Sequence, residues 1–363
     1  MNLKTMPSPP HKTYRIGAVG AGFIMRDVQL VAYRNAGFDV AAITSTPSAD
    51  ARKAADLRGI PRVYSSLDEM LTDTSIEIID IAVPPHAQLE IVRQVAAYKH
   101  IRGILAQKPL AINYDQAVET VQICDRAGVR LAVNQNMRYD QSIRALKTLL
   151  TRGDLGRPVL ATIEMRAIPH WQTWLRDYDR LTLLNMSIHH LDSFRFLFGD
   201  PESIYLSVAQ DPRTAFAHRD GIALYILEYA DGMRACAWDD VWAGPAREGA
   251  AADLYIKWRV EGTDGMAQGA IGWAHYPNAV PSTIEFTTRN GSPCMSSPQW
   301  KEVWFPDAFS GPMGELMNSI AMDREPVIGG HDNLKTMALV EAGYRSLEQH
   351  RPVAVNEIIG ARA

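Results

Sequence analysis

The sequence contains little cysteine and no long apolar run. Its three cysteines, Cys124, Cys236 and Cys294, lie far apart, and no CxxC pair occurs. Neither a disulfide framework nor a thiolate zinc site is indicated, and a reducing compartment such as the cytoplasm is expected. No stretch approaches the roughly 20 apolar residues of a membrane-spanning helix. The sequence therefore predicts a soluble cytoplasmic protein with no membrane partner.

We also expect no secretion signal. Residues 1–13 are polar and contain Pro7, Pro9 and Pro10, but they include no apolar core and no twin arginine. Because a signal peptide requires an apolar segment, we expect these residues to form a flexible arm.

The chain has no excess of charge of one sign. It carries 37 Lys and Arg against 41 Asp and Glu, for a formal net charge of -4, and the basic residues form no dense run. Since nucleic-acid binding requires a concentrated basic face, no nucleic-acid partner is expected. The length of 363 residues favours two domains, and a hydrophobic content of 47% is ordinary for a globular enzyme.

The first third of the chain alternates between short apolar runs and helical segments. Continuous apolar runs are typical of buried parallel strands, and the alternation of strands with helices indicates a parallel sheet. We therefore predict an α/β fold with an N-terminal Rossmann domain over residues 14–138. The predicted strands are 16–19, 38–43, 78–83, 103–106 and 129–133, and the predicted helices are 28–35, 48–57, 89–98 and 114–127.

The pattern changes after about Met137. Several later segments alternate apolar and polar residues, as half-buried antiparallel strands do. We predict a second α/β domain over residues 139–363 with a mostly antiparallel sheet. Its predicted strands are 159–166, 203–209, 222–229, 233–241, 254–262 and 282–288, and its predicted helices are 142–152, 184–198, 314–322 and 332–348.

A Gly-Ala-Gly loop at residues 20–22 ends the first predicted strand. In this position glycines permit a tight turn, and the N-terminus of the next helix donates to a pyrophosphate. The third glycine of the GxGxxG pattern is replaced by Met25, and an ordinary strand-to-helix turn is the alternative. We predict binding of NAD or NADP, with contacts from Gly20, Gly22, Phe23 and Ile24.

The end of the second predicted strand bears on the choice of cofactor. NAD enzymes usually place Asp or Glu there to bind the ribose hydroxyls, whereas this chain has Ser45 and Thr46, with no carboxylate before Asp50. Nothing in this stretch repels a 2'-phosphate, and Arg52 and Lys53 follow. We predict a slight preference for NADP, with Ser45 and Thr46 at the ribose.

Four segments carry a resemblance to a known family. They are Gly20-Ala21-Gly22-Phe23-Ile24, Val83-Pro84-Pro85-His86-Ala87-Gln88, Gln107-Lys108-Pro109-Leu110-Ala111 and Asn185-Met186-Ser187-Ile188-His189-His190-Leu191-Asp192. The last segment resembles an Asp-x-Gly-x-His-x-x-Asp motif. Over about residues 14–355 the chain resembles the glucose–fructose oxidoreductase / inositol dehydrogenase / MocA (Gfo/Idh/MocA) family.

The resemblance implies a Rossmann domain followed by an α/β domain with a large open sheet. It also implies that the nicotinamide lies between the domains, and that the outer face of the sheet forms a homodimer or homotetramer. Lys108 matches the family's active-site lysine, at the cofactor, and His189 matches the histidine that relays the substrate hydroxyl proton. Pro84 and Gln88 are expected on the nicotinamide side, and Gln88 stands where the family commonly has histidine.

Three positions depart from the motifs of the family. Gln107 replaces a glutamate, Asn185 an aspartate and Ser187 a glycine. A Lys-Asp-His triad is therefore absent. We expect His189 and Lys108 to do the proton chemistry while Asn185 orients the substrate.

These residues suit the transfer of a hydride to or from a carbinol carbon. Histidine has an ordinary pKa of about 6.5, close to the working pH, and can accept the hydroxyl proton. A lysine beside the same oxygen stabilises the developing alkoxide. We predict an NAD(P)-dependent dehydrogenase or reductase that acts on a sugar, polyol or cyclitol. The alternatives are an NAD-dependent glycosidase and a non-catalytic sugar or nucleotide sensor.

Several further residues have two interpretations. Arg138 is predicted to contact cofactor or substrate, with a surface salt bridge as the alternative. Trp171 suits the C–H face of a sugar but equally a core or interface position, and His190 is assigned to the substrate, with a structural role as the alternative. No metal site is expected, since neighbouring histidines on a helix point about 100° apart. A polar and aromatic cluster, predicted to be a substrate loop or a subunit contact, comprises Asp239, Asp240, Trp242 and Arg247.

Overall fold

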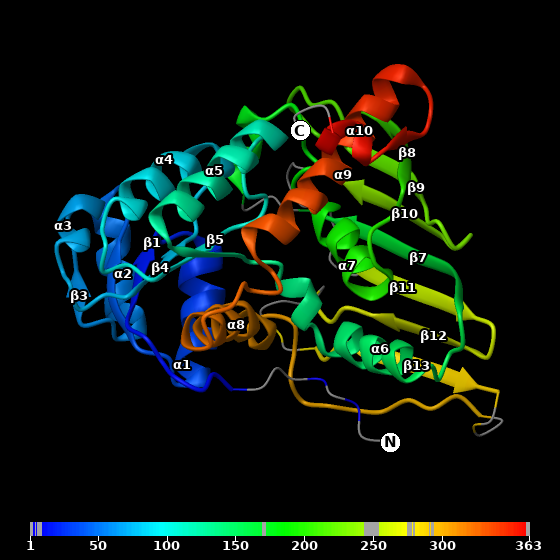
Figure 1. Ribbon diagram of the computed structural model, residues 1–363, viewed down its shortest axis with the longest axis horizontal. Coiled ribbons are helices and arrows are strands. Elements are labelled where there is room, and N and C mark those ends of the chain that lie inside the picture. Colours follow the sequence, from blue (N-terminus) through cyan, green and yellow to red (C-terminus); the bar gives the residue numbers. More distant parts are fainter. Residues whose placement is uncertain are drawn as a thin grey trace. The chain divides into compact units, whose positions relative to one another are not determined.

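Two β-sheets form the framework of the protein, one in each of two units (Figure 1). The computed structural model describes residues 3, 5, 9–168, 172–242, 254–273, 278, 280–289, 291 and 294–360. The first unit comprises Pro7–Asn136 and Pro306–Leu334, and the second comprises Met1–Met6, Met137–Phe305 and Lys335–Ala363. Residues 306–334 thus belong to the first unit, although the sequence pattern assigned them to the second domain.

The first unit is built on six parallel strands in the order β3-β2-β1-β4-β5-β6. Every position of β1, β4 and β5 is buried, as expected of a sheet that is covered on both faces. The predicted parallel sheet of a Rossmann fold is confirmed. The strands are β1 (Ile16–Val19), β2 (Val40–Thr44), β3 (Arg62–Val63), β4 (Ile78–Ile81), β5 (Gly103–Ala106) and β6 (Arg130–Val133).

Helices cover both faces of this sheet. Figure 1 shows α4 (Pro85–Ala96) and α5 (Tyr114–Ala127) on one side, and α1 (Leu30–Ala36) and α8 (Ser310–Ala321) on the other. The remaining helical segments are the π-helical η1 (Ile24–Gln29), α2 (Ser48–Arg58) and α3 (Leu67–Leu71). The strand order reverses between β1 and β4, so the loops after these strands meet at the carboxyl edge, where open α/β sheets bind their ligands.

Helix α5 shows how local sequence sets the boundaries of an element. The Asn113 side chain accepts a hydrogen bond from the Gln116 backbone N–H at 2.9 Å, which satisfies a donor of the first turn. Gly128 follows the last turn with a φ of 70°, a left-handed conformation that glycine adopts easily. The sequence predicted the same boundaries, residues 114–127.

Residues 306–334 join the first unit through packing on two strands. Helix α8 lies against β5 and β6. A Cβ atom at Gly103 of β5 would come within 2.7 Å of Ile320 and 3.2 Å of Leu316, so the helix packs closely over this glycine. Gly329 pairs with Ala132 of β6. Residues 306–334 thus pack on strands that lie far away in the sequence, and the local sequence pattern could not predict this packing.

The second unit contains an eight-stranded sheet in the order β13-β12-β11-β7-β10-β9-β8-β14. β7 and β10 pair in parallel, and every other neighbouring pair is antiparallel. The predicted large, mostly antiparallel sheet is confirmed. The strands are β7 (Pro158–Ala167), β8 (Ser203–Ala209), β9 (Ile222–Glu228), β10 (Arg234–Val241), β11 (Tyr255–Gly262), β12 (Gly265–Ala270), β13 (Thr283–Thr288) and β14 (Val353–Ala354).

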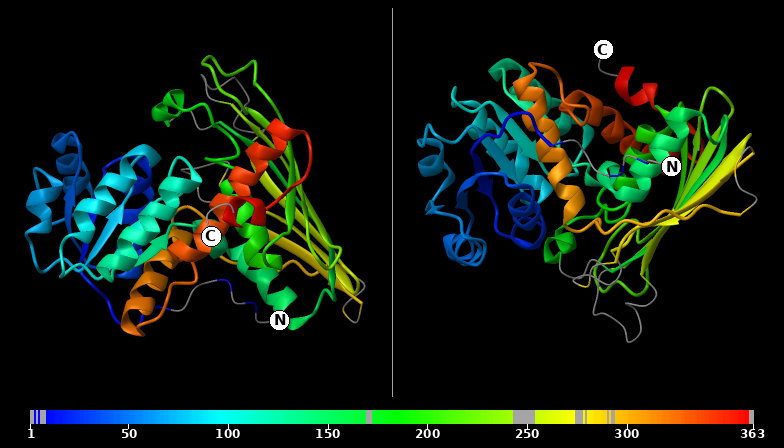
Figure 2. Two further views of the ribbon diagram at one scale, coloured as in Figure 1. Left: turned by 45° about the horizontal axis from the view of Figure 1, so that its top comes forward. Right: turned by 90° about the horizontal axis from the view of Figure 1, so that it is seen from below.

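Helices cover one face of this second sheet (Figure 2). Alternate side chains of β9 point to the opposite face, where Leu224 and Ile226 are 50% and 46% exposed. This open apolar face suits the predicted homodimer or homotetramer, which stays a prediction. The helical segments are α6 (Gln141–Arg152), α7 (Ile188–Phe198), α9 (Gly330–Gln349) and α10 (Asn356–Ile359), with the 3₁₀ turns η2 (Asn136–Tyr139), η3 (Thr173–Asp177) and η5 (Asp307–Phe309).

Some short strands and helices were missed in the sequence, namely β3, α3, β12, β14 and α10. β12 has the sequence GMAQGA, which lacks apolar alternation, and it is a strand because β11 and β13 pair with it on both sides. Helix α7 begins at Ile188, four residues later than predicted. Within the described part of the chain, no helix is both long enough and apolar enough to cross a membrane.

Candidate functional site

The loop after β1 is held close to the neighbouring strands. Gly20 has a φ of 99°, and its N–H donates to the Thr44 carbonyl oxygen at 2.9 Å. A Cβ atom at Gly20 would overlap the Ala82 carbonyl oxygen, so this position requires glycine. Gly22 is exposed, and a Cβ atom there would meet no atom within 4 Å. The loop therefore offers the open cradle that the pyrophosphate of NAD or NADP requires.

The helical run after this loop begins earlier than predicted. Segment η1 starts at Ile24, four residues before the predicted start at Val28, and continues into α1. Phe23 and Ile24 are half-buried next to Gly22. Met25, at the third glycine position, is fully buried, so its side chain leaves the loop open.

The end of β2 carries hydroxyl groups in place of a carboxylate. Ser45 is half-buried and Thr46 is exposed. The next acidic residue along the chain, Asp50, has its Oδ1 atom 3.7 Å from the Lys53 ammonium. The two hydroxyl groups can bind a ribose oxygen. The ammonium group of Lys53 partly neutralises the negative charge of Asp50.

The turn that carries Lys108 is shaped by Gln88. The side-chain amide of Gln88 donates to the carbonyl oxygens of Gln107 (3.1 Å) and Pro109 (2.8 Å) and accepts from the Gln107 N–H (2.7 Å). Gln88 has no exposed surface. These bonds give Gln88 a structural role in the turn, and its predicted contact with the cofactor stays a prediction. Pro84 is half-buried at the start of α4, next to the end of β4.

Lys108 follows β5, at the carboxyl edge of the first sheet. Its side chain is half-buried, and its backbone N–H donates to Gln107 Oε1 at 3.0 Å. Burial lowers the pKa of Lys108 to about 7, because the ammonium form is disfavoured where water is excluded. A lysine with this pKa can hold or release a proton near neutral pH, as an active-site residue must.

A buried polar cluster that sequence reasoning missed reaches this turn. The Asp80 carboxyl accepts from Gln29 Nε2 at 2.8 and 3.0 Å and from the Tyr33 hydroxyl at 2.7 Å. Gln107 Nε2 in turn donates to Gln29 Oε1 at 3.4 Å. Burial raises the pKa of Asp80 to about 7. The Gln29 side chain thus links the Asp80 carboxyl to Gln107. An aspartate inside an otherwise apolar strand was the feature of the sequence that could have revealed this cluster.

His189 lies in the first turn of α7, in the second unit. The loop before α7 is fixed by Asp220, whose carboxylate accepts the N–H groups of Leu181 (2.7 Å) and Leu183 (2.8 Å). His189 is 7% exposed, and its ring meets Trp304 edge to face, with 5.8 Å between the ring centroids. Trp304 was not singled out from the sequence, since the residue lies more than a hundred positions away. The Trp304 ring therefore forms an apolar side of the environment of His189.

The other polar residues of the segment 185–192 point into the interior of the protein. Asn185 is buried, and its amide donates to Gln172 Oε1 at 3.1 Å. His190 has no exposed surface, and its Nδ1 lies 3.0 Å from Asp239 Oδ1, while the Ser187 hydroxyl donates to the other oxygen of Asp239. This burial against Asp239 favours the structural alternative for His190, and its assignment to the substrate stays an untested prediction. The role of Asn185 stays a prediction.

Arg138 forms a buried ion pair with Asp192 of α7. Its Nε and Nη2 atoms donate to the two carboxylate oxygens, each at 2.6 Å, and the Thr336 hydroxyl donates to the same carboxylate at 3.0 Å. The side chains of Arg138 and Asp192 are 7% and 2% exposed. This pairing corresponds to the salt-bridge alternative in a buried form, and the predicted contact with cofactor or substrate stays a prediction.

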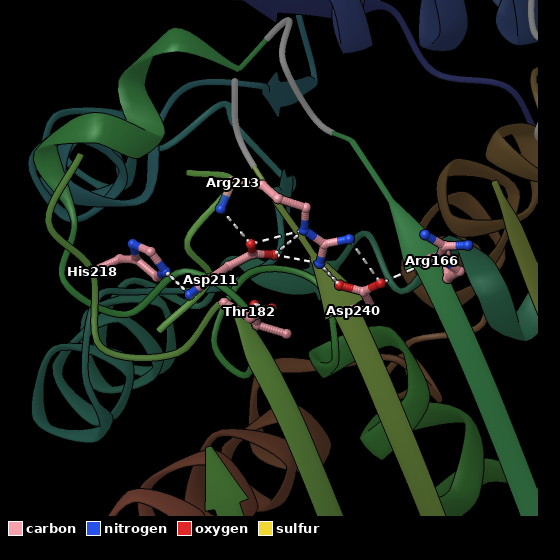
Figure 3. Close-up of polar contacts among 7 residues, drawn as sticks. Arg166, Thr182, Asp211, Arg213, His218 and Asp240 are labelled. Atoms are coloured by element: carbon pink, nitrogen blue, oxygen red, sulfur yellow. Dashed lines mark hydrogen bonds and ion pairs between the residues drawn. The ribbon is translucent and has the colours of Figure 1, made fainter. Parts of the chain in front are cut away.

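The predicted polar and aromatic cluster divides between the two faces of the second sheet. Asp239 faces α7, whereas Asp240 lies between two arginines on the other face. Figure 3 shows Arg213 bridging Asp211 and Asp240, with Arg166 on the far side of Asp240. The two cations and the carboxylates balance one another, so this cluster fixes the loop before β9 and offers little net charge to a ligand.

Two predicted contacts cannot be placed. Trp171 and Arg247 lie outside the described residues. Among the residues that the structure does describe, no group of three or more His, Cys, Asp or Glu side chains could hold a metal ion. The candidate residues that can be placed therefore comprise the loop after β1, the end of β2 and Lys108 in the first unit, and the His189 region in the second.

Two family models match the chain. One is described as an oxidoreductase family with an NAD-binding Rossmann fold and matches residues 14–135. The other is the GFO/IDH/MocA C-terminal domain and matches residues 143–268. The boundary between the two matches falls at residues 136–142, close to the predicted change of pattern after Met137.

Individual proteins are similar over most of the chain. The D-apiose dehydrogenase of Paraburkholderia graminis is 28% identical over 358 residues, which are 96% of this chain and 91% of that protein. The myo-inositol 2-dehydrogenase of Thermotoga maritima is 22% identical over 317 residues, 85% of this chain and 89% of that protein. The crystal structure of an oxidoreductase from Agrobacterium radiobacter, in complex with NAD+, L-tartaric acid and magnesium, has a TM-score of 0.80 at 24% identity and covers 96% of this chain and 100% of that chain. This structural likeness supports the fold.

Proposed function

This chain belongs to the Gfo/Idh/MocA family of oxidoreductases, and we propose that it transfers a hydride between NAD(P) and a carbinol carbon of a sugar, polyol or cyclitol. The observation that carries the proposal is the half-buried Lys108 at the carboxyl edge of the first sheet, with a pKa that burial lowers to about 7. This edge also carries the open glycine loop at Gly20 and Gly22. A cofactor cradle and a lysine of altered pKa on one edge are what this chemistry requires.

The two candidate catalytic residues have complementary tasks. In the oxidation direction, His189 accepts the proton of the substrate hydroxyl, and the Lys108 ammonium stabilises the negative charge that develops on the oxygen. The bound nicotinamide supplies the hydride acceptor. Asn185 orients the substrate through its side-chain amide, since it cannot take up a proton as an aspartate can. Trp304, beside His189, excludes water from the proton acceptor.

The cofactor is NAD or NADP, with NADP favoured slightly. Ser45 and Thr46 at the end of β2 present hydroxyl groups to the ribose. The exposed side chains of Arg52 and Lys53 add positive charge nearby on α2, which favours a 2'-phosphate. Gly20, Gly22, Phe23 and Ile24 hold the pyrophosphate.

The substrate is a small sugar or polyol, and the active form is a homodimer or homotetramer. The similarity to the D-apiose and myo-inositol dehydrogenases supports hydroxyl-rich substrates of five or six carbons. The open face of the second sheet, with Leu224 and Ile226 exposed, supports assembly through that face.

A panel of sugars with both cofactors tests this proposal. The protein is mixed with NAD+ or NADP+ and with D-apiose, other aldoses, myo-inositol and open-chain polyols, and the absorbance of the reduced nicotinamide is recorded. We expect reduction of the cofactor with at least one aldose or cyclitol, and a kcat/KM for NADP+ no lower than that for NAD+. Cofactor binding without turnover of any member of the panel would refute the proposal, and a clear preference for NAD+ would refute its cofactor part.

A further inference from the structure

A cavity opens on the surface of the second unit between α6 and α7. It has a volume of about 310 Å³, and the two helices that line it pack against each other (Figure 1). This volume lies at the lower end of the range of roughly 300–1,000 Å³ that small-molecule sites occupy. The lining residues are Arg144, Lys147, Thr148, Thr151, Arg152 and Phe196.

The lining combines three cations with two hydroxyl groups, and none of its six side chains carries a carboxyl. The five residues from α6 recur at intervals of three and four, so they lie along one stripe of the helix. The other stripe of α6, which includes Ile143, Leu146 and Leu149, is buried in the protein. Because the whole chain has a formal net charge of -4, this concentration of positive charge is a local feature.

The ammonium group of Lys147 is held at the edge of the cavity by neutral partners. It donates to the carbonyl oxygens of Phe196 (2.7 Å) and Leu197 (3.2 Å) at the end of α7, which uses two of its three N–H groups. Burial, and secondly the charge of Arg138, lower the pKa of Lys147, and burial lowers the pKa of Arg144. A bound anion would offset these effects, because it would bring negative charge to a lining that has none.

The hydroxyl groups and the aromatic ring of the lining indicate what accompanies the anion. The Thr148 hydroxyl donates to the Arg144 carbonyl oxygen at 2.9 Å, so its oxygen can accept a hydrogen bond from a ligand hydroxyl. The Phe196 ring lies 5.2 Å from the Lys147 ammonium and forms an apolar wall. Guanidinium and ammonium groups together suit the oxygens of a phosphate group, and threonine hydroxyls suit a hydroxyl-bearing carbon chain.

We propose that this cavity binds a phosphorylated sugar or polyol. The phosphate lies at Arg144, Lys147 and Arg152, and the carbon chain with its hydroxyl groups lies at Thr148 and Thr151. The lining includes neither of the residues proposed for hydride transfer. The site therefore stands independently of the proposed function, and its test is a binding measurement.

Isothermal titration calorimetry on the full chain with D-ribose 5-phosphate and with inorganic phosphate tests the proposal. We expect the sugar phosphate to bind more tightly than inorganic phosphate, because only the former engages the threonine hydroxyls. In the double variant Arg144→Gln/Arg152→Gln, affinity for the sugar phosphate is expected to fall at least about tenfold, since hydrogen bonds to charged groups are lost. The single variant Arg152→Gln changes an exposed side chain and should fold. It is expected to lose less affinity than the double variant, and it serves as the test if the double variant does not fold.

Two control variants test whether the sugar phosphate binds at this cavity. Lys99→Gln removes a cation from the first unit, and Lys108→Met alters the proposed active site. Both are expected to bind the sugar phosphate with wild-type affinity. The proposal is overturned if the sugar phosphate does not bind, if Arg152→Gln and the double variant bind as the wild type does, if Lys99→Gln weakens binding equally, or if Lys108→Met abolishes it.

Discussion

Replacing Lys108 with methionine is expected to reduce kcat by about 10²–10³-fold, because removing one donor to a developing oxyanion has an effect of this size. Methionine matches the length of lysine without its charge. The turn itself is held by Gln88 through backbone atoms of Gln107 and Pro109, so its shape survives the change. Affinity for NAD(P), measured by fluorescence titration, is expected to stay close to that of the wild type. A variant with nearly wild-type kcat would show that Lys108 is not catalytic.

The low pKa of Lys108 also predicts a pH dependence. Burial lowers this pKa to about 7, so the ammonium form predominates below that pH and is lost as the pH rises through it. Because the charged form stabilises the alkoxide, kcat/KM for sugar oxidation should decline above about pH 7. Lys108→Arg keeps its charge throughout the range and should lack this decline. An identical alkaline decline in Lys108→Arg would assign the ionisation to another group.

Replacing His189 with alanine is expected to lower kcat by about 10²–10⁴-fold, the range for the loss of a general base. In the proposed mechanism the imidazole accepts the hydroxyl proton, so its removal leaves the substrate without a proton acceptor. Trp304 keeps its contacts with Trp273 and Phe305, which should preserve the wall of the site. Steady-state kinetics measure the loss of kcat, and a melting curve shows whether the fold is preserved. Wild-type turnover in His189→Ala would remove this residue from the mechanism.

The neighbouring histidine provides the matched contrast. His190 is fully buried against Asp239, so His190→Gln should lower the melting temperature because it disturbs a buried polar pair. Its kcat per folded molecule should stay far above that of His189→Ala. If His190→Gln instead lost turnover without losing stability, the roles assigned to the two histidines would be reversed.

Local pattern predicted the elements whose boundaries are set by neighbouring residues. β5 and α5 have the predicted bounds. The apolar run of β5 and the Asn113 cap of α5 are local features that a few neighbouring residues define. β12 was missed because a strand rich in glycine and alanine depends on its two neighbours for pairing. Residues 306–334 were misplaced because their packing against β5 involves residues about two hundred positions away.

The site shows the same division between local and remote causes. The positions of Lys108 and the glycine loop at the ends of strands could be predicted, because ligands bind at strand ends in this fold, and their roles stay predictions. The roles of Gln88 and Arg138 depend on partners 19 and 54 positions away, which the chain order does not reveal. The Asp80 cluster likewise joins three elements of the first unit.

Transfer of a hydride from the sugar carbon is tested most directly with an isotope. A substrate identified in the panel is prepared with deuterium on the carbon that is oxidised, and the reduced cofactor from the reaction is analysed by mass spectrometry. The predicted result is one deuterium in the reduced nicotinamide. Reduced cofactor without deuterium would contradict direct hydride transfer and with it the function proposed for this protein.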